Sequence, residues 1–159
     1  MKYDVFGIGN ALVDKEFEVS DDFLAAQDIA KGMMSLIDEP TQLRLLDNMK
    51  QTFGLKKRAS GGSAANTIVA VSQFGGKTFY ACKVANDAAG EFYMNDLHAA
   101  GVVTGLNQVR CNSEGVTGKC LVMVTPDAER TMNTFLGITA DFSENELHLD
   151  ELKQAQYLY

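Results

Sequence analysis

Long apolar runs and paired cysteines are both missing from this sequence. No apolar run approaches the roughly 20 residues that span a bilayer, and the N-terminus has no apolar segment of the kind found in signal peptides. The three cysteines, Cys82, Cys111 and Cys120, are too few and too scattered for a disulfide framework, and none forms a zinc-binding CxxC pair. We therefore expect a cytoplasmic protein with reduced thiols and no membrane partner.

Positive charge is also scarce. The 159 residues include 14 basic and 21 acidic side chains, which give a formal net charge of −7. A nucleic-acid-binding surface needs clustered lysine and arginine, so no nucleic-acid partner is expected. The one basic cluster, Lys56-Lys57-Arg58, is interpreted as a solvated loop. The length suffices for one domain with a real core.

Short apolar strands alternate with helices along much of the chain. Strand patterns cover residues 3–9 and 77–84, and a helix followed by Gly101 is predicted over residues 87–100. The segment 64–74 is apolar on nearly every side, which predicts a buried helix. The alternation of strands and helices indicates the α/β class.

A second group of strands has a different pattern. Its segments lie near residues 12–19, 33–37, 115–124 and 130–136. They look amphipathic and are joined by hairpins or short loops, with Pro126-Asp127-Ala128-Glu129 as a hairpin turn. Helices capped by Ser20 and Asp38 are expected between the first of these strands. This pattern predicts a small second sheet that stands off the main one.

The last residues of the sequence continue the α/β pattern. Ser143 is expected to cap a helical region over residues 144–154, and Tyr157-Leu158-Tyr159 then begins another apolar strand. A strand that stops as it enters a sheet leaves strand edges uncovered. We therefore expect residues 1–159 to be the N-terminal part of a single longer domain.

Two glycine-rich segments mimic nucleotide-binding motifs. Gly7-Ile8-Gly9-Asn10 lacks the third glycine of the dinucleotide fingerprint, because Leu12 occupies that position and a strand pattern follows. Gly76-Lys77-Thr78 resembles the end of a phosphate-binding P-loop, but Val71 replaces the first glycine and a strand follows. We reject both motifs.

A third glycine-rich segment is a stronger candidate for a ligand site. Gly61-Gly62-Ser63-Ala64-Ala65-Asn66 places two glycines at a helix N-terminus, where backbone amides can approach a ligand and Asn66 follows one turn later. A tight turn packed in the core explains this segment equally well. Asn10 and Asp14, four residues apart, suit a polyol. Spacing alone nevertheless favours a turn asparagine and a solvated aspartate.

Arg130 and Cys120 complete the set of candidates. Arg130 follows the hairpin turn, and its planar guanidinium suits a phosphate group, although an exposed charge at a strand edge is as good an explanation. Cys120 lies in an apolar β-rich run, so a packed small side chain is expected rather than a nucleophile. His98 and His148 have no partners at metal-ligand spacing, and no metal site is predicted.

Together these motifs resemble the ribokinase-like pfkB family of carbohydrate and nucleoside kinases. The family's first signature, a Gly-Gly pair, an Asn and a small-residue helix ending in glycine, is matched by residues 61–76. Its opening strand is matched by residues 7–14, and its lid strands by residues 115–120 and 130–137. The resemblance covers essentially the whole chain in order and is strongest for the adenosine kinase group and its bacterial sugar-kinase relatives.

The resemblance implies a fold and a set of residue roles. The fold would be a mostly parallel α/β sheet flanked by helices, with a small β-sheet lid over the substrate. Asp14, with Asn10 beside it, would hold two sugar hydroxyls, and Arg130 would approach the transferred phosphate. The residues expected to contact the sugar are Gly61, Gly62, Ser63 and Asn66. Those expected on the base or aglycone side are Cys120, Thr134 and Leu136.

The resemblance further implies an ATP-dependent kinase that uses Mg²⁺ and phosphorylates the primary hydroxyl of a ribosyl nucleoside or a sugar. The family's second signature, Asp-Thr-x-Gly-Ala-Gly-Asp, supplies the general base and an anion hole. It is missing from this sequence, and residues 87–91 are the only segment that partly resembles it. The main ATP and Mg²⁺ sites would therefore lie in an absent C-terminal half, and residues 1–159 alone should be inactive. A furanose kinase that does not act on nucleosides and a non-catalytic sugar-binding fragment are the alternatives. The resemblance is compatible with either a monomer or a homodimer.

Overall fold

The computed structural model describes residues 1–106 and 114–159, so Cys111 lies outside the described residues. The chain divides into two compact units. Unit 1 comprises Met1–Val13, Ser60–Gly118 and Leu136–Tyr159, and unit 2 comprises Asp14–Ala59 and Lys119–Phe135. Across the described ranges, no helix has both the length and the apolar character needed to cross a membrane.

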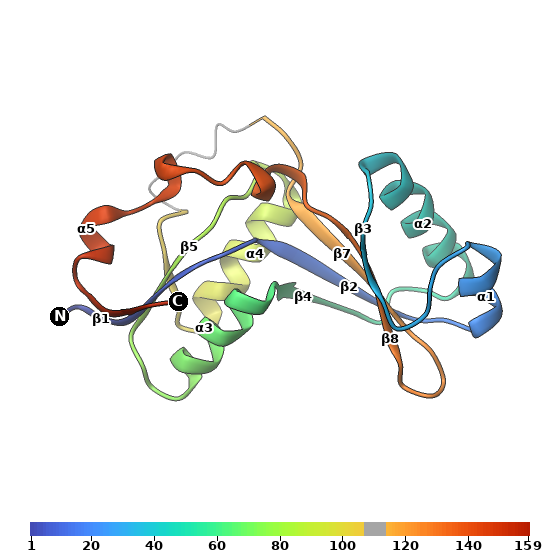
Figure 1. Ribbon diagram of the computed structural model, residues 1–159, viewed down its shortest axis with the longest axis horizontal. Helices are drawn as coiled ribbons and strands as arrows, with labels where there is room; N and C mark the ends of the chain where they lie inside the picture. Colours follow the sequence, from blue (N-terminus) through green and yellow to red (C-terminus); the bar gives the residue numbers. More distant parts are fainter. Residues whose placement is uncertain (107–113) are drawn as a thin grey trace. The chain divides into compact units, whose positions relative to one another are not determined.

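Unit 1 is built on a four-stranded parallel sheet (Figure 1). The strand order is β6-β5-β1-β9, so the first strand of the chain lies inside the sheet. Val5 is in register with Thr78 on one side and with Tyr157 on the other, and both pairings are parallel. The strands are β1 (Tyr3–Ile8), β5 (Thr78–Ala81), β6 (Val103–Thr104) and β9 (Ala155–Leu158).

Two helices of unit 1 follow strands and pack on the sheet. Helix α3 (Ser63–Gln73) contacts β1 and β5, and α4 (Ala88–Ala99) contacts β6. The Asp87 carboxylate caps α4 by accepting from the backbone N–H of Gly90 at 2.7 Å, and it also accepts from the Thr117 hydroxyl at 2.7 Å. Gly101 follows the helix with φ +81°, the left-handed conformation that ends many helices.

Helix α3 is less buried than its composition predicted. Only Ala65 and Ile68 are fully buried, and Phe74 just beyond its end is 92% exposed. The helix packs one face on β1 and β5, and its other apolar side chains are only partly covered. The expectation of a helix buried all round is wrong for the described chain, because an all-apolar composition does not itself provide packing partners on every side.

The segment after Ser143 also differs from the single helical region that was expected. Ser143 does cap a turn, η2 (Glu144–Glu146), through a reciprocal capping box in which its backbone N–H donates to Glu146 at 2.7 Å. Leu147 then adopts an extended conformation with ψ 119°, which ends the turn. A second short helix, α5 (Leu149–Leu152), precedes β9.

Unit 2 contains most of a five-stranded sheet with the order β3-β8-β7-β2-β4. Four of its strands overlap the segments with the amphipathic pattern: β2 (Leu12–Glu18), β3 (Met34–Leu36), β7 (Gly118–Val124) and β8 (Arg130–Phe135). The fifth, β4 (Lys57–Gly61), was missed, since its basic and small residues were interpreted as a loop. Backbone pairing with β2 explains it, and the Lys56 N–H donates to the Glu16 carbonyl at 2.9 Å as β4 begins.

Two helices, α1 (Asp21–Ala26) and α2 (Glu39–Thr52), cover one face of this sheet. The core on that face includes Phe17 from β2, Leu45 and Met49 from α2, and Leu121 and Met123 from β7. Successive side chains in a strand point to opposite faces. The second face of β2, β7 and β8 therefore carries the residues between those core positions.

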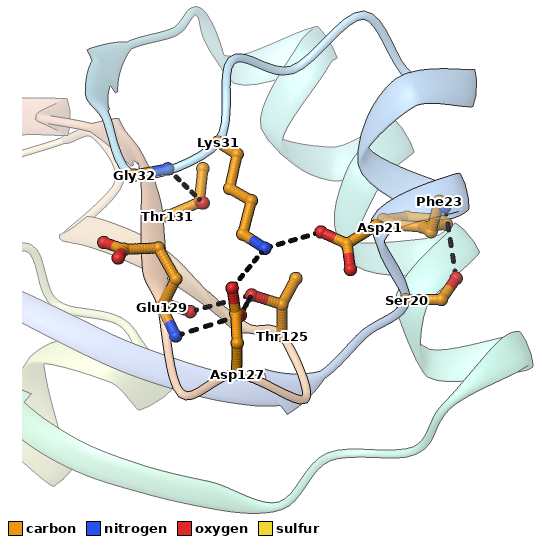
Figure 2. Close-up of polar contacts among 9 residues, drawn as sticks. All are labelled: Ser20, Asp21, Phe23, Lys31, Gly32, Thr125, Asp127, Glu129 and Thr131. Atoms are coloured by element: carbon orange, nitrogen blue, oxygen red, sulfur yellow. Dashed lines mark hydrogen bonds and ion pairs between the residues drawn. The ribbon is translucent and has the colours of Figure 1, made fainter.

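The β7–β8 hairpin is tied to the loop between α1 and β3 (Figure 2). The Lys31 ammonium lies 2.6 Å from the Asp21 carboxylate and 2.7 Å from that of Asp127, at the hairpin turn. Asp127 also accepts from the Thr125 hydroxyl at 2.7 Å, which fixes the turn itself. The Gly32 N–H donates to the Thr131 hydroxyl of β8 at 2.9 Å, so an ion pair and a hydrogen bond link the loop to the hairpin.

Candidate functional site

The Gly61-Gly62 turn lies against Asn10 in unit 1. Gly62 has φ +102°, and a Cβ atom built there would lie 2.6 Å from the Asn10 carbonyl oxygen. Both the conformation and the space therefore require glycine at this position. The turn places the start of α3 beside the loop that follows β1, so two segments far apart in sequence meet here.

Two buried tyrosines hold this arrangement, and neither was identified from the sequence. The Tyr80 hydroxyl from β5 donates to the Asn10 carbonyl at 3.2 Å, and the Tyr93 hydroxyl from α4 donates to the Gly61 carbonyl at 3.1 Å. Both tyrosines are fully buried. Their contacts leave the amide side chain of Asn10 available, since it is the backbone carbonyl that accepts. No local pattern in the sequence could have shown these pairs, which are 70 and 32 residues apart.

The first turn of α3 offers polar groups to a ligand. Gly62 occupies the cap position and has no side chain that could accept from the first N–H groups of the helix. Ser63 and Asn66 are exposed, and no hydrogen bond of either side chain is found within the described part of the chain. Asn10, Gly61, Gly62, Ser63 and Asn66 thus form one neutral set of hydrogen-bonding groups in unit 1, and Leu136 belongs to the same unit.

Leu136 lies where the chain enters η1 (Gly137–Asp141). A Cβ atom built at Gly118 would lie 2.6 Å from the Leu136 carbonyl and 2.7 Å from that of Ala11, so three backbone segments meet tightly there. The Thr139 hydroxyl in η1 accepts from the Ala11 N–H at 2.8 Å. The segment just after Asn10 is therefore held by η1 as well as by Tyr80.

The remaining candidate residues belong to unit 2, and several of them are charged. Arg130 at the start of β8 donates to the Glu16 carboxylate of β2 at 3.1 Å. Burial raises the pKa of Asp14 to about 6; the Arg130 charge lowers this pKa and the Glu16 charge raises it further. The three residues thus form one electrostatic group, and Glu16 is a member that was not identified from the sequence.

Cys120 and Thr134 are partners across the β7–β8 ladder. They are in register, and the Thr134 hydroxyl lies 3.3 Å from the Cys120 sulfur. Burial raises the pKa of the Cys120 thiol to about 11, so the thiol stays protonated and is no nucleophile at neutral pH. This agrees with the expectation of a packed side chain.

Two apolar residues of β3 lie on the same face of the unit 2 sheet as Cys120 and Thr134. Met34 and Leu36 are in register with Met132 and Thr134 of β8, and they are 57% and 63% exposed. Strand parity places them on the face of Thr134 and Cys120, opposite the helix-covered core. The sequence pattern of this three-residue strand could not show which of its residues point to which face.

The described residues provide no cluster of three or more His, Cys, Asp or Glu side chains that could hold a metal ion. The possible anion contacts among the candidates are the Arg130 guanidinium and the first N–H groups of α3.

Comparison with known proteins assigns the chain to a family. Residues 31–159 match the family model described as pfkB family carbohydrate kinase. Adenosine kinase 2 of Arabidopsis thaliana is 31% identical over 121 residues, which make up 74% of this chain and 34% of that protein. The probable fructokinase-5 of the same plant is 31% identical over 111 residues, or 64% of this chain and 32% of that protein.

Solved structures agree in fold over the whole chain. The adenosine kinase from Sinorhizobium meliloti has a TM-score of 0.89 at 36% identity, covering 100% of this chain and 47% of that one. A probable sugar kinase from Rhizobium etli has a TM-score of 0.89 at 34% identity, covering 99% and 46%. The chain therefore spans about a third of the length of these curated relatives and about half of that of these structures.

These matches confirm the α/β fold class predicted from the sequence, a ribokinase-like parallel sheet flanked by helices. They also support the expected kinase class at the level of the family, whose members here include adenosine and sugar kinases. The chain belongs to the pfkB family of carbohydrate kinases.

Proposed function

We propose that the protein containing this chain is an ATP-dependent kinase that phosphorylates the primary hydroxyl of a ribosyl nucleoside, with an adenosine-like nucleoside as first candidate. The observation that carries the proposal is the Gly62 turn, whose glycine conformation and missing side chain bring the start of α3 against Asn10. A family match and similarity to adenosine kinases support the reaction class. One related structure, from Schistosoma mansoni, is an adenosine kinase in complex with adenosine, with a TM-score of 0.82 at 25% identity.

In unit 1 the proposed role is neutral recognition of the sugar. The Asn10 amide and the exposed Ser63 and Asn66 side chains would exchange hydrogen bonds with sugar hydroxyls. Gly61 and Gly62 would let a sugar ring approach the backbone closely, because no side chain stands in the way. The buried hydroxyls of Tyr80 and Tyr93 would keep this surface rigid by holding the two carbonyls.

In unit 2 the proposed role is recognition by charge. The Asp14 carboxylate would accept from two neighbouring sugar hydroxyls, which requires the ionised form. Arg130 would exchange its contact with Glu16 for one with the transferred phosphoryl group as charge develops on it. Cys120 and Thr134 would contact the base.

The exposed apolar side chains of β3 favour a nucleoside over a free sugar. Met34 and Leu36 lie on the face of the sheet that also carries Cys120 and Thr134. A flat base gains from apolar contacts of this kind, whereas a free furanose offers mainly hydroxyls. The relatives described as fructokinase and sugar kinase make a furanose kinase the second candidate.

ATP would supply the phosphoryl group, and Mg²⁺ would neutralise part of its charge. Neither the general-base aspartate of the family's second signature nor a metal cluster is found among the described residues. We therefore expect residues 1–159 to be inactive as a kinase by themselves. Their proposed contribution is to bind and orient the acceptor.

The experiment is a comparison of substrates with the full-length protein. ATP consumption is measured with adenosine, inosine, guanosine, ribose and fructose, in the parent and in a Met34→Ser/Leu36→Ser double variant. A nucleoside kinase should prefer a nucleoside, and the double variant should raise KM for nucleosides at least about tenfold while leaving ribose unaffected. Met33→Ser is the matched control, because Met33 is equally exposed at 57% and precedes the strand. A preference for fructose or ribose, unchanged in the double variant, would establish the furanose alternative.

A further inference from the structure

The ion pair between Glu16 and Arg130 crosses over an intervening strand. Glu16 lies in β2 and Arg130 begins β8, and the strand order β3-β8-β7-β2-β4 places β7 between them. Neighbouring strands lie about 4.8 Å apart, so the backbones of β2 and β8 are about 10 Å apart. The carboxylate and the guanidinium nevertheless meet at 3.1 Å. Both side chains must therefore reach across β7 toward each other.

This ion pair lies on the face of the sheet that carries the acceptor candidates. In β2, Glu16 alternates with Phe17, whose side chain packs in the helix-covered core, and it shares its face with Asp14 two residues earlier. In β8, Arg130 shares its face with Thr134 four residues later. The Glu16–Arg130 pair therefore lies among residues proposed to bind the acceptor, on the face opposite the core.

Arg130 is held only loosely by this contact. Its side chain is 60% exposed, and Glu16 is the one ion-pair or hydrogen-bond partner of its guanidinium in the ranges that the structure describes. A guanidinium has five N–H donors, and the contact uses one nitrogen, Nη2. The pair is not needed to join β2 to β8, because β7 lies between these strands in the sheet. Exposed ion pairs contribute little stability, so a stronger anion can displace Glu16.

The charges of this pair also act on the proposed acceptor carboxylate. Burial is the main cause that raises the pKa of Asp14 to about 6; the positive charge of Arg130 lowers this pKa, and the negative charge of Glu16 raises it. A ligand bound at Asp14 is therefore within electrostatic range of both members of the pair.

The ligand at this site gains charge in the proposed reaction. The acceptor is neutral, whereas its phosphate ester carries about two negative charges at pH 8. The ester attracts a guanidinium more strongly than one carboxylate does, and its several oxygens suit the unused donors of Arg130. A product held in this way would leave slowly unless another anion binds Arg130 in its place. Glu16 is suited to do so, since its carboxylate lies at hydrogen-bonding distance from Arg130.

We propose that Glu16 is a positioning residue that competes with the phosphate group of the product for Arg130 and so promotes product release. The inference rests on the proposed function, because it requires Arg130 to meet the transferred phosphoryl group. While the ester is bound, Arg130 contacts the phosphate, whose charge repels the Glu16 carboxylate. As the ester leaves, Glu16 binds Arg130 again, and this ion pair offsets part of the free energy lost with the phosphate contact.

The test compares acceptor and product binding by the full-length protein at pH 8, where Asp14 is ionised. Three ligand pairs are measured: adenosine with adenosine 5′-monophosphate, ribose with ribose 5-phosphate, and fructose with fructose 6-phosphate. Titration calorimetry gives the Kd of the acceptor, and displacement of the acceptor gives the Kd of the ester at the same site. For the pair with the preferred acceptor, the ratio of these two constants is the readout, because a general loss of structure changes both.

Glu16→Gln removes the charge and keeps the shape of the side chain. It should raise the preference for the ester over the acceptor about fivefold, or about 1 kcal/mol, the upper end of the range for exposed ion pairs. Glu18→Gln is the matched control: Glu18 lies on the same face of β2 but pairs with Lys56 at 3.1 Å, so this substitution should change the ratio less than about twofold. Arg130→Ala should lower the preference for the ester at least about tenfold, the scale of one charged hydrogen bond.

Two results would overturn this inference alone. One is an unchanged ratio in Glu16→Gln while Arg130→Ala still weakens binding of the ester. The other is a gain of about fivefold from Glu16→Gln in the Arg130→Ala background, which would mean that Glu16 repels the phosphate directly and does not compete for Arg130. A ratio that Arg130→Ala leaves unchanged would contradict the proposed role of Arg130 and this inference with it.

Discussion

The two units present their candidate residues by different physical means. Unit 1 uses backbone geometry: a glycine turn at a helix N-terminus, beside neutral side chains, with the Asn10 and Gly61 carbonyls held by two buried tyrosines. Unit 2 uses charged side chains on one face of a sheet, with Asp14, Glu16 and Arg130 acting on one another. Unit 1 should therefore be sensitive to added volume, and unit 2 to changes of charge or pH.

The largest expected effect comes from added volume in unit 1. Gly62→Val places a side chain at φ +102° and 2.6 Å from the Asn10 carbonyl, so the turn must move away from Asn10. We expect substrate binding by the full-length enzyme to be lost and thermal stability to fall, since a strained residue alone costs on the order of 1–3 kcal/mol. Calorimetric binding and thermal unfolding measure both effects.

Gly75→Val is the matched control for that substitution. Gly75 has a similar conformation, φ +91°, but a Cβ atom there meets nothing within 4 Å. This variant should lose stability through backbone strain alone and still bind substrate. If Gly62→Val bound substrate as well as Gly75→Val does, the Gly61-Gly62 pair would be only a structural turn.

The next effect concerns charge in unit 2. If Asp14 accepts from two sugar hydroxyls, Asp14→Ala in the full-length enzyme should weaken substrate binding by about 2–4 kcal/mol, or roughly 30- to 700-fold. Folding should change little, because no structural hydrogen bond of this carboxylate is found in the described part of the chain. Titration calorimetry with substrate gives the answer, and near-parent affinity would refute the proposed role.

Protonation offers a milder way to remove the same charge. The pKa of Asp14 is raised from 3.8 to about 6, so the folded protein binds the extra proton between those values, and the stability from Asp14 decreases as pH rises through this window. Substrate binding needs the carboxylate, so affinity should fall below about pH 6. Glu16→Gln removes a charge that raises this pKa and should shift the fall to lower pH. A pH profile identical in Asp14→Ala and in the parent would contradict this.

Arg130 should affect the rate more than the binding of substrate. Because it would meet the phosphoryl group only as charge develops, Arg130→Ala should lower kcat by about 100-fold, the scale for losing one transition-state donor, with a smaller rise in KM. Steady-state kinetics separate the two parameters. A change confined to nucleoside affinity would instead place Arg130 in the acceptor pocket.

The smallest effect tests the core of unit 2. Gln42 on α2 is fully buried, and neither atom of its amide has a hydrogen-bond partner among the described residues. Gln42→Leu should raise the free energy of unfolding by about 1 kcal/mol, because an unsatisfied buried amide is costly. Gln51→Leu is the control: Gln51 is exposed on the same helix and bonds to Asp47, so no gain is expected. A loss of stability in Gln42→Leu would show that the amide is satisfied in solution.

Elements with local signals could be predicted from the sequence. Ser20 and Asp38 cap α1 and α2 as expected, since a cap depends on residues only three apart. Strand β4 was missed because its formation depends on pairing with β2 and not on its own composition. In the candidate site, glycine spacing identified the Gly62 turn, but the Glu16–Arg130 pair joins positions 114 residues apart and has no local signal.

The Lys31 link to the hairpin has a consequence for the order of folding. Lys31 and Asp127 are 96 residues apart, and closing a loop of that length costs about 4 kcal/mol from its length-dependent part alone. A single exposed ion pair stabilises a protein by far less than this loop-closure cost, so the pair alone cannot bring the two segments together. The parallel pairing of β3 with β8 does so, and the ion pair joins segments that are already neighbours. Lys31 should therefore act after the rate-limiting step: Lys31→Ala leaves the refolding rate unchanged and accelerates unfolding.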